Sequence, residues 1–240
     1  GAVKRGNRVR PYHEQDGIVI YHGDCRDVLP ALSADAIITD PVWPNCEHVF
    51  PGIDAKALLG EALRLSNVER VVIQLGCASD VRFLGVVPDR FGYLRTCWLD
   101  YACPSYRGRI LNTGDVAYVF GEPPVPRPGA IILPGHKTST RTTADDWRDI
   151  SRRKTQRKGK ERGAIPAIAL QHPTPRRIEH VAWLLKWFGG ESVIDPFVGS
   201  GTTLVAAKRS GQRAIGIELE ERYCEIAVKR LAQGALPLEM

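Results

Sequence analysis

Short apolar runs that alternate with helical patterns constrain the fold of this sequence most strongly. Apolar runs typical of buried strands occupy residues 18–21, 36–39, 71–75, 192–194 and 214–217, and two further β-rich segments occupy 93–99 and 116–120. Helical patterns occupy residues 26–32, 55–65, 175–188, 202–209 and 220–231. Strands that alternate with helices form parallel sheets, because each crossover returns the chain to the same edge. We therefore expect an α/β fold.

The length and composition fit one domain of this kind. The chain has 240 residues, of which 43% are hydrophobic and 25% charged, ordinary values for a globular protein with a sizeable core. No apolar run approaches the roughly 18 residues that a membrane span needs, and residues 1–5 lead into no signal-peptide core. We expect a single soluble domain over residues 1–240, with no membrane contact and a cytoplasmic location.

The cysteines are spread along the chain without a C-x-x-C pair. The six positions are Cys25, Cys46, Cys77, Cys97, Cys103 and Cys224. This spacing favours neither a zinc site nor a disulfide framework, so we expect free thiols in a reducing compartment and no metal.

The net charge of +6 is concentrated in one segment. Between Trp147 and Arg162 eight basic residues stand against two acidic ones, and the rest of the chain is balanced. The candidates for nucleic-acid contact are Arg148, Arg152, Arg153, Lys154, Arg157, Lys158 and Lys160. They lie in a Pro-rich and basic stretch, residues 121–165, that we expect to be a loop insertion attractive to polyanions. The alternative is a solvated loop with no specific partner.

A glycine-rich turn joins the expected strand 192–194 to the expected helix 202–209. Its glycines allow a ligand to approach the backbone, and its hydroxyl and amide groups offer hydrogen-bond donors. Glu218 ends the next strand, where a carboxylate can accept hydrogen bonds from ribose hydroxyls. The pattern predicts an adenosine cofactor. A turn that needs glycine for its geometry alone is the simpler alternative.

A dinucleotide oxidoreductase is the rival enzyme class for this turn. Its fingerprint also ends in an acidic residue about 20 positions after the glycines. Leu204 stands where the third glycine of that fingerprint would be. A cofactor without a pyrophosphate therefore fits the turn better.

A second candidate site follows the expected strand 36–39, at the edge where α/β sheets bind ligands. Asp40 and a backbone carbonyl near Pro41 can both accept from one NH2 group, and Trp43 offers a flat face for a ring. Such a site suits a base with an exocyclic amine. An Asp-Pro turn with a core tryptophan is the structural alternative.

These segments together resemble the amino-group DNA methyltransferases that use S-adenosylmethionine, in the subgroup whose base-binding tetrapeptide precedes the cofactor motif. Residues 40–43 (DPVW) are similar to that family's (D/N/S)-P-P-(Y/F/W). Residues 195–203 (DPFVGSGTT) closely match its D-P-F-x-G-S-G-T-T motif. Residues 23–25 resemble its G-D-C opening, 172–174 its H-P-T element and 216–218 its G-x-E ribose motif.

The resemblance implies a circularly permuted, Rossmann-like methyltransferase fold with a mostly parallel seven-stranded sheet, and S-adenosylmethionine as the cofactor. Residues 121–165 stand where this family often carries its target-recognition segment. The implied catalytic residues are Asp40, Pro41 and Trp43. The implied cofactor-binding residues are Asp24, Cys25, His172, Thr174, Asp195, Phe197, Gly199, Ser200, Gly201, Thr202 and Glu218.

The substrate implied by the resemblance is double-stranded DNA, with the target base rotated out of the duplex. An acid at position 40 favours the N6 amine of adenine over the N4 amine of cytosine, where serine is commoner in the family. Cytosine N4 and a catalytically inactive nucleic-acid-binding relative are the alternatives. A homodimer and an accompanying restriction enzyme are left open, in a bacterial, archaeal or phage context.

The sequence departs from the family pattern at two places. Val42 replaces the second proline, which leaves the backbone less rigid beside the expected amine site. Arg176 and Arg177 stand where a lysine and a proline commonly follow the H-P-T element. This change alters the helix start but keeps the positive charge.

Overall fold

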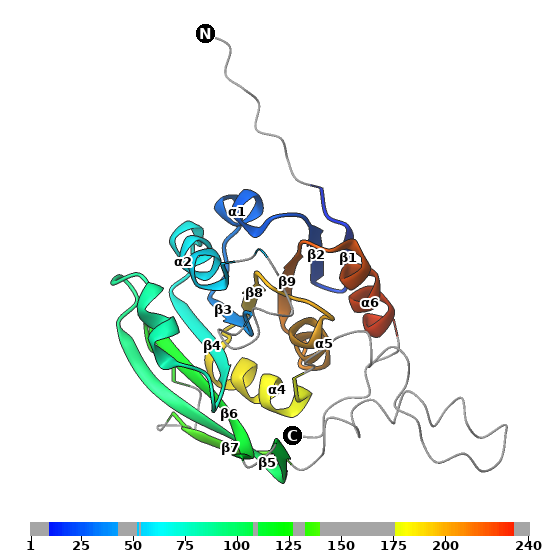
Figure 1. Cartoon of the computed structure of the whole chain (residues 1–240). Helices are drawn as coiled ribbons and strands as arrows, with labels where there is room; N and C mark the ends of the chain where they lie inside the picture. Colours follow the sequence, from blue (N-terminus) through cyan, green and yellow to red (C-terminus); the bar gives the residue numbers. More distant parts are fainter. Residues whose placement is uncertain are drawn as a thin grey trace, which may run out of the picture.

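A mixed nine-stranded sheet forms the centre of the molecule (Figure 1). The computed structural model describes residues 10–42, 52, 54–107, 110–126, 133–139 and 176–232. Within these residues the strands are β1 (His13–Gln15), β2 (Ile18–His22), β3 (Ala36–Thr39), β4 (Arg70–Gly76), β5 (Tyr93–Arg107), β6 (Ile110–Gly121), β7 (His136–Thr138), β8 (Ser192–Asp195) and β9 (Arg213–Glu218). Their spatial order is β1-β2-β9-β8-β3-β4-β6-β5-β7.

The strands β2, β9, β8, β3 and β4 are consecutive in the sheet and run parallel. The strand β1 pairs antiparallel with β2, whereas β6 pairs antiparallel with both β4 and β5, and β7 lies parallel to β5. The mostly parallel α/β fold is thus confirmed. The expected number of seven strands is wrong for the described residues, which form nine. The edge strands β1 and β7 have three residues each, all exposed or half-buried, and so lack a buried apolar run that marks a strand.

Helices cover both faces of the sheet. On one face lie α1 (Cys25–Val28), the 3-10 helices η1 (Leu29–Ala31) and η3 (Val81–Val86), and α2 (Ala55–Leu65). On the other face lie α4 (Ile178–Phe188), α5 (Thr202–Arg209) and α6 (Glu221–Leu231). The helix expected over 26–32 is split after Val28, since Pro30 has no N–H to continue an α-helical ladder. Asp54 caps the start of α2, because its Oδ1 accepts from the Ala57 amide at 2.9 Å.

The parallel strands send alternate side chains into two separate cores. Ile37 packs on the side of α1 and α2, and its neighbour Ile38 packs on the side of α4, α5 and α6. Val71 and Val72 of β4 divide in the same way. Since both faces of these strands are buried, their sequences read as continuous apolar runs instead of an alternation. That pattern made the central strands predictable.

Part of the expected insertion at residues 121–165 forms regular structure. The strand β7 lies where a loop was expected, and the Trp98 amide of β5 donates to the Gly135 carbonyl just before it at 2.9 Å. Other expected features lie outside the described residues: Trp43, His172, Thr174, and the basic candidates Arg148, Arg152, Arg153, Lys154, Arg157, Lys158 and Lys160. In the described ranges, no helix has the length and apolar character needed to cross a membrane.

Candidate active site

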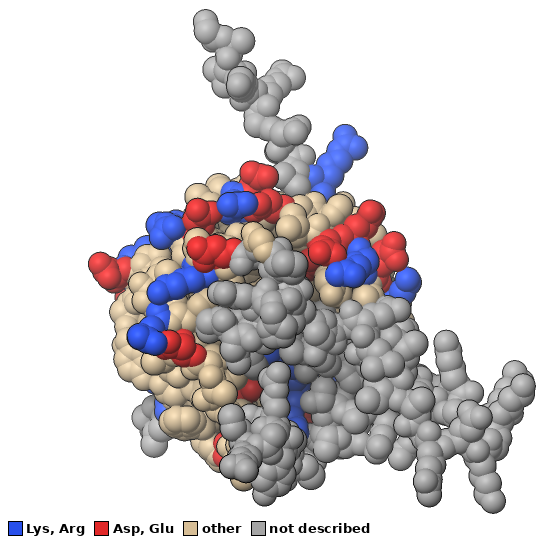
Figure 2. All heavy atoms as spheres, in the orientation of Figure 1, with Lys and Arg blue, Asp and Glu red and all other residues tan. Residues whose placement is uncertain are grey.

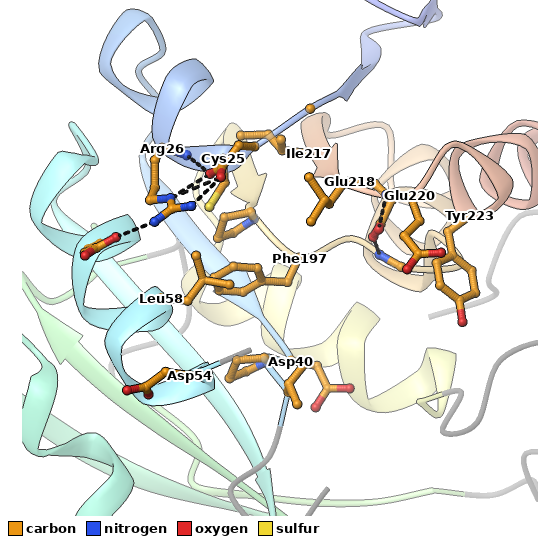
Figure 3. A pocket seen from close by; sticks show the side chains of 18 of the residues that line it. Cys25, Arg26, Asp40, Asp54, Leu58, Phe197, Ile217, Glu218, Glu220 and Tyr223 are labelled. Carbon is orange, nitrogen blue, oxygen red and sulfur yellow. Dashed lines mark hydrogen bonds and ion pairs between the residues drawn. The ribbon is translucent and has the colours of Figure 1, made fainter. Parts of the chain in front are cut away.

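A pocket of about 380 Å³ opens at the carboxyl ends of β2, β9, β8 and β3 (Figure 3). One residue at the end of each of these strands lines the pocket: Gly23 after β2, Glu218 in β9, Pro196 after β8 and Asp40 after β3. Parallel strands bring such residues to one edge, which is where open α/β sheets bind ligands. The volume falls within the roughly 300–1,000 Å³ of small-molecule sites. Figure 3 shows Phe197 near the middle, with Asp40 and Glu218 on different sides of it.

The Glu218 carboxylate is held at the end of β9 by two backbone amides. Its Oε2 accepts from the Gly199 amide at 2.9 Å, and its Oε1 accepts from the Glu220 amide at 2.8 Å. Burial raises the pKa of Glu218 above its ordinary value in spite of these two hydrogen bonds. A carboxylate oxygen has two acceptor positions, so each oxygen can still accept from a ligand hydroxyl. Glu218 is thus placed to bind a diol.

Asp195 lies behind the pocket and fixes the turn that forms its wall. Its Oδ1 accepts from the Thr39 hydroxyl at 2.8 Å and from the Phe197 amide at 3.2 Å, and its Oδ2 accepts from the Thr203 hydroxyl at 2.6 Å. Burial raises the pKa of Asp195 to about 6. The side chain therefore connects β3, β8 and α5.

The serine, glycine and threonine that follow in the turn also have partners inside the protein. The Nη1 group of Arg230, from α6, donates to the Ser200 carbonyl at 2.6 Å, to the Ser200 hydroxyl at 3.1 Å and to the Thr202 hydroxyl at 3.2 Å. Gly201 has a φ of 82°, and a Cβ built on it would lie 2.7 Å from the Ala227 Cβ of α6. Only Phe197 and Gly199 of the turn's expected cofactor ligands line the pocket.

The opening motif of the chain places Asp24 and Cys25 in the same pocket. Asp24 caps α1, since its Oδ1 accepts from the Arg26 amide at 2.9 Å, and it also forms a 2.6 Å ion pair with the Arg26 side chain. These hydrogen bonds from Arg26 lower the pKa of Asp24. Arg26 also reaches Glu61 of α2 at 3.0 Å. Burial raises the pKa of the Cys25 thiol to about 12, so the thiol stays protonated at neutral pH.

Asp40 and Pro41, which follow β3, line the other side of the pocket together with Val42. The Nε group of Arg176 donates to Oδ2 of Asp40 at 2.5 Å, and the Nη1 group of Arg176 lies 3.8 Å from Oδ2 of Asp115. Sequence reasoning missed this pairing, although it noticed that arginine replaces the family's usual lysine at position 176.

The side chains of Leu58 and Tyr223 complete the walls from α2 and α6, and they too were not predicted. Leu58 is one residue of an amphipathic helix, and nothing in the sequence near it indicates a ligand. Tyr223 lies in the first turn of α6, the helix after Glu218, which is the only sequence signal that could have drawn attention to it.

The charged side chains in the described lining of the pocket are mainly acidic. Its carboxylates are Asp24, Asp40, Asp54, Glu61, Glu218 and Glu220, and its basic side chains are Arg26 and Arg176. Figure 2 shows acidic side chains over α1, α2 and α6, the elements around this end of the sheet, with basic side chains between them. This charge balance favours a ligand with positive charge.

Comparison with known proteins identifies the family. A family model described as DNA methylase (N6_N4_Mtase) matches residues 97–229, more than half of the chain. The protein belongs to this DNA methylase family.

Curated relatives match this chain over a short segment. The type II methyltransferase M2.LlaDCHI of Lactococcus lactis subsp. cremoris is 48% identical over 67 residues, which is 27% of this chain and 25% of the relative. For M2.DpnII of Streptococcus pneumoniae the match covers 24% of the relative. The chain thus matches about a quarter of the length of these curated relatives.

Solved structures match this chain over most of its length. A crystal structure of the M1.HpyAVI–SAM complex has a TM-score of 0.58 at 22% identity, covering 89% of this chain and 99% of the other. The cytosine-N4-specific PvuII DNA methyltransferase has a TM-score of 0.58 at 14% identity, covering 97% and 99%. These likenesses confirm the fold of the domain.

Proposed function

We propose that this protein is a DNA methyltransferase that moves a methyl group from S-adenosylmethionine to the exocyclic N6 amine of adenine in double-stranded DNA. One observation carries the proposal: a single pocket joins Glu218 and Gly199, suited to an adenosine cofactor, to Asp40 and Pro41, suited to an amine. Membership of the DNA methylase family supports it. The base-binding motif precedes the cofactor motif, which is the basis for proposing a circularly permuted order.

The residues of the pocket fit the cofactor in charge and in hydrogen bonding. S-adenosylmethionine carries a sulfonium cation and a ribose diol. The described lining residues include six carboxylates and two arginines, so acidic side chains exceed basic ones. A dinucleotide brings a doubly negative pyrophosphate to this edge, which the same carboxylates would repel. When bound, S-adenosylmethionine supplies an activated methyl group. Asp24, Cys25, Phe197, Gly199 and Glu218 would hold it, with His172 and Thr174 proposed as further ligands.

The base side of the pocket supplies acceptors for amine protons. A base amine is a poor nucleophile, because its nitrogen lone pair is delocalised into the ring. The Asp40 carboxylate and the Pro41 carbonyl would hold the two N–H groups and orient the nitrogen toward the methyl group. The base must leave the stack at a cost of a few kcal/mol, and stacking on Trp43 would return about 1–3 kcal/mol. Asp40 favours adenine N6 by its resemblance to the adenine-specific members.

The partner that we propose for the basic segment is the DNA backbone. Arg148, Arg152, Arg153, Lys154, Arg157, Lys158 and Lys160 would contact phosphates and position the duplex. The bacterial relatives are type II methyltransferases, so we propose a restriction-modification context in the cytoplasm.

Analysis of nucleosides by mass spectrometry tests the chemistry. Unmethylated double-stranded DNA treated with the wild-type protein and S-adenosylmethionine should contain N6-methyladenine. Asp40→Ala should abolish the transfer while S-adenosylmethionine affinity changes less than about threefold, because Asp40 acts on the amine. Asp80→Ala is the matched control, since Asp80 is an exposed helix cap that does not line the pocket, and it should leave transfer unchanged.

Calorimetry tests the cofactor site. Glu218→Ala should weaken S-adenosylmethionine binding by about 1.5–3 kcal/mol, typical of hydrogen bonds to a charged group. Glu220→Ala is the control: it removes a neighbouring carboxylate of the lining but keeps Glu218, the proposed acceptor for the diol. This variant should lose much less binding free energy than Glu218→Ala.

Three results would contradict parts of the proposal. N4-methylcytosine in the treated DNA would overturn the base assignment. Cofactor binding without transfer to any DNA would favour the inactive relative. Tight NAD binding with no response to S-adenosylmethionine would overturn the cofactor.

A further inference from the structure

We propose that Arg176 is a positioning residue of the methyl-transfer site, which holds the Asp40 carboxylate in the orientation that receives the substrate amine. This inference rests on the proposed function and deepens it. Arg176 is separated from Asp40 by 136 positions in the sequence, yet the two side chains are in direct contact.

The contact is short and largely shielded from water. Arg176 Nε and Asp40 Oδ2 are 2.5 Å apart, and the two side chains are 11% and 24% exposed. Both residues line the pocket. An ion pair at a protein surface contributes little, because water screens it and both side chains lose freedom. Here the surroundings already restrict both side chains, so the pair can fix the geometry of the carboxylate.

A second carboxylate holds Arg176 from behind. Asp115 of β6 is 4% exposed, and its Oδ2 lies 3.8 Å from the Nη1 group of Arg176. The Gln74 side chain of β4 donates to the same Oδ2 atom at 3.2 Å, and Gln74 is itself buried. The strands β3, β4 and β6 are neighbours in the sheet. The guanidinium therefore lies between a carboxylate at the end of β3 and a carboxylate of β6, and a side chain of β4 fixes the second of these.

Arginine is suited to this bridging position. Its planar guanidinium directs N–H groups along different edges, so Nε can bind Asp40 while Nη1 faces Asp115. Burial alone would lower the pKa of Arg176, but Asp40 and Asp115 outweigh this effect and raise the pKa, so the side chain stays cationic. A lysine carries a single ammonium group and can replace the charge but not the two directions.

The arrangement has a consequence for catalysis. An acceptor that is displaced by about 1 Å can cost a reaction on the order of 100-fold in rate. Asp40 follows the last residue of β3, where the chain leaves the sheet, so its side chain depends on contacts outside the strand. Arg176 touches Asp40 and would not touch the reacting atoms. Its loss should thus act on turnover and not on cofactor binding.

The experiment compares kcat, the KM for DNA, S-adenosylmethionine affinity and Tm in four full-length variants and the wild type. Arg176→Gln should lower kcat by about 10- to 100-fold, with the KM for DNA and the cofactor affinity within about threefold. Arg176→Lys should recover part of kcat. Asp115→Asn should lower kcat less than Arg176→Gln, because Asp40 keeps its direct partner.

Arg70→Gln is the matched control for a lost buried arginine. Arg70 is 5% exposed, begins β4 at the opposite end of the strand from the pocket, and donates to the carbonyls of Glu122 and Phe188. This variant should lower Tm and leave kcat unchanged.

Several outcomes would overturn the inference. Arg176→Gln with normal kcat and only a lowered Tm would give Arg176 a structural role. Weaker cofactor binding with normal kcat would make it a ligand-binding residue. If Arg176→Gln does not fold, normal kcat in both Arg176→Lys and Asp115→Asn would overturn the inference. A wild-type protein without any transfer would instead overturn the proposed function, and the positioning role with it.

Discussion

Gly201, in the DPFVGSGTT motif of residues 195–203, is a glycine that packing requires. Its φ of 82° lies in the left-handed region, and a Cβ would meet the Cβ of Ala227 at 2.7 Å. Gly199 of the same motif lines the pocket and has a φ of 50°. The two glycines therefore serve different purposes: Gly201 allows α6 to approach the turn, and Gly199 forms part of the pocket wall.

Replacement of Gly201 by alanine should separate backbone strain from steric overlap. Gly211 is the matched control, since its φ is 68° and nothing lies within 4 Å of a Cβ built on it. We expect Gly211→Ala to lower the free energy of unfolding by about 1–2 kcal/mol, the cost of the left-handed conformation. Gly201→Ala should cost about 1–3 kcal/mol more, because α6 must also move. Urea unfolding measures both, and equal losses would contradict the packing role.

Asp195 and His180 are buried titratable residues with opposite effects on stability. Burial raises the pKa of Asp195 to about 6, so its contribution to stability is present at low pH and is lost as the pH rises through 6. Burial lowers the pKa of His180 to about 4, so its contribution is present above the unfolded value of about 6.5 and is lost as the pH falls through 4. Between about pH 4 and 6 the two slopes oppose each other.

Asp195→Asn should therefore make the free energy of unfolding rise more steeply with pH between about 4 and 6 than it does in the wild type. The change in slope should approach about 1.4 kcal/mol per pH unit at most, the value for one proton. His180→Gln should shift the slope in the opposite direction. Urea unfolding at half-unit pH steps measures both slopes. Parallel curves for the wild type and Asp195→Asn would contradict the effect of burial.

At the scale of elements, Arg230 connects the end of α6 to the start of α5. Its Nη1 group donates to the Ser200 carbonyl at 2.6 Å and to the Thr202 hydroxyl at 3.2 Å. The turn that precedes α5 carries Phe197 and Gly199 into the pocket. Contact between the two helices thus supports the wall of the candidate site.

Arg230→Met should lower the free energy of unfolding by about 1–3 kcal/mol, since the hydrogen bonds to the turn are lost. It should also weaken S-adenosylmethionine binding, because the wall of the pocket is less well held. Lys229→Met is the control: Lys229 is exposed and pairs with Glu225 at 3.4 Å, so its loss should cost less than about 0.5 kcal/mol. Denaturation measures the free energy of unfolding of the two variants, and calorimetry measures their affinity for S-adenosylmethionine. Equal losses in both variants would contradict the role of Arg230 in holding the turn.

At the scale of the whole molecule, the charge is divided between an acidic pocket and a basic segment. The described pocket lining has more carboxylates than arginines, and the excess of positive charge lies between residues 147 and 162. A cationic cofactor and an anionic duplex would thus meet different parts of one chain.

Neutralising Arg152, Arg153, Arg157 and Lys158 should flatten the dependence of log DNA affinity on log salt concentration. Each lost phosphate contact changes the slope by about 0.9 for duplex DNA, so the change should reach about three to four units. Cofactor affinity should not change. The control neutralises the exposed residues Arg64, Arg82, Arg213 and Lys229. DNA binding at several salt concentrations is the measurement, and equal slopes in wild type and variant would return the segment to a solvated loop.

The elements with local signals could be predicted from the sequence, and the contacts between distant elements could not. The strand 36–39 and the helices 55–65 and 202–209 are found with the expected bounds, because buried apolar runs, the Asp54 cap and Gly201 act within a few residues. The strands β1 and β7 were missed, since a short edge strand depends on the backbone of its neighbour and not on its own side chains.

In the candidate site, too, some features follow from local sequence and others depend on contacts between distant elements. Motif spacing and the rule that parallel strands end at one edge were enough to expect Asp40 and Glu218 at strand ends where ligands bind. That both line one pocket is a finding of the structure. Which motif residues line the pocket was decided only by tertiary structure, because Asp195, Ser200 and Thr202 find their partners on β3, α5 and α6. The ion pair of Arg176 with Asp40 belongs to the same class. The two residues are 136 positions apart in the sequence, so their contact depends on how the sheet and its helices pack. No local pattern near either residue predicts it.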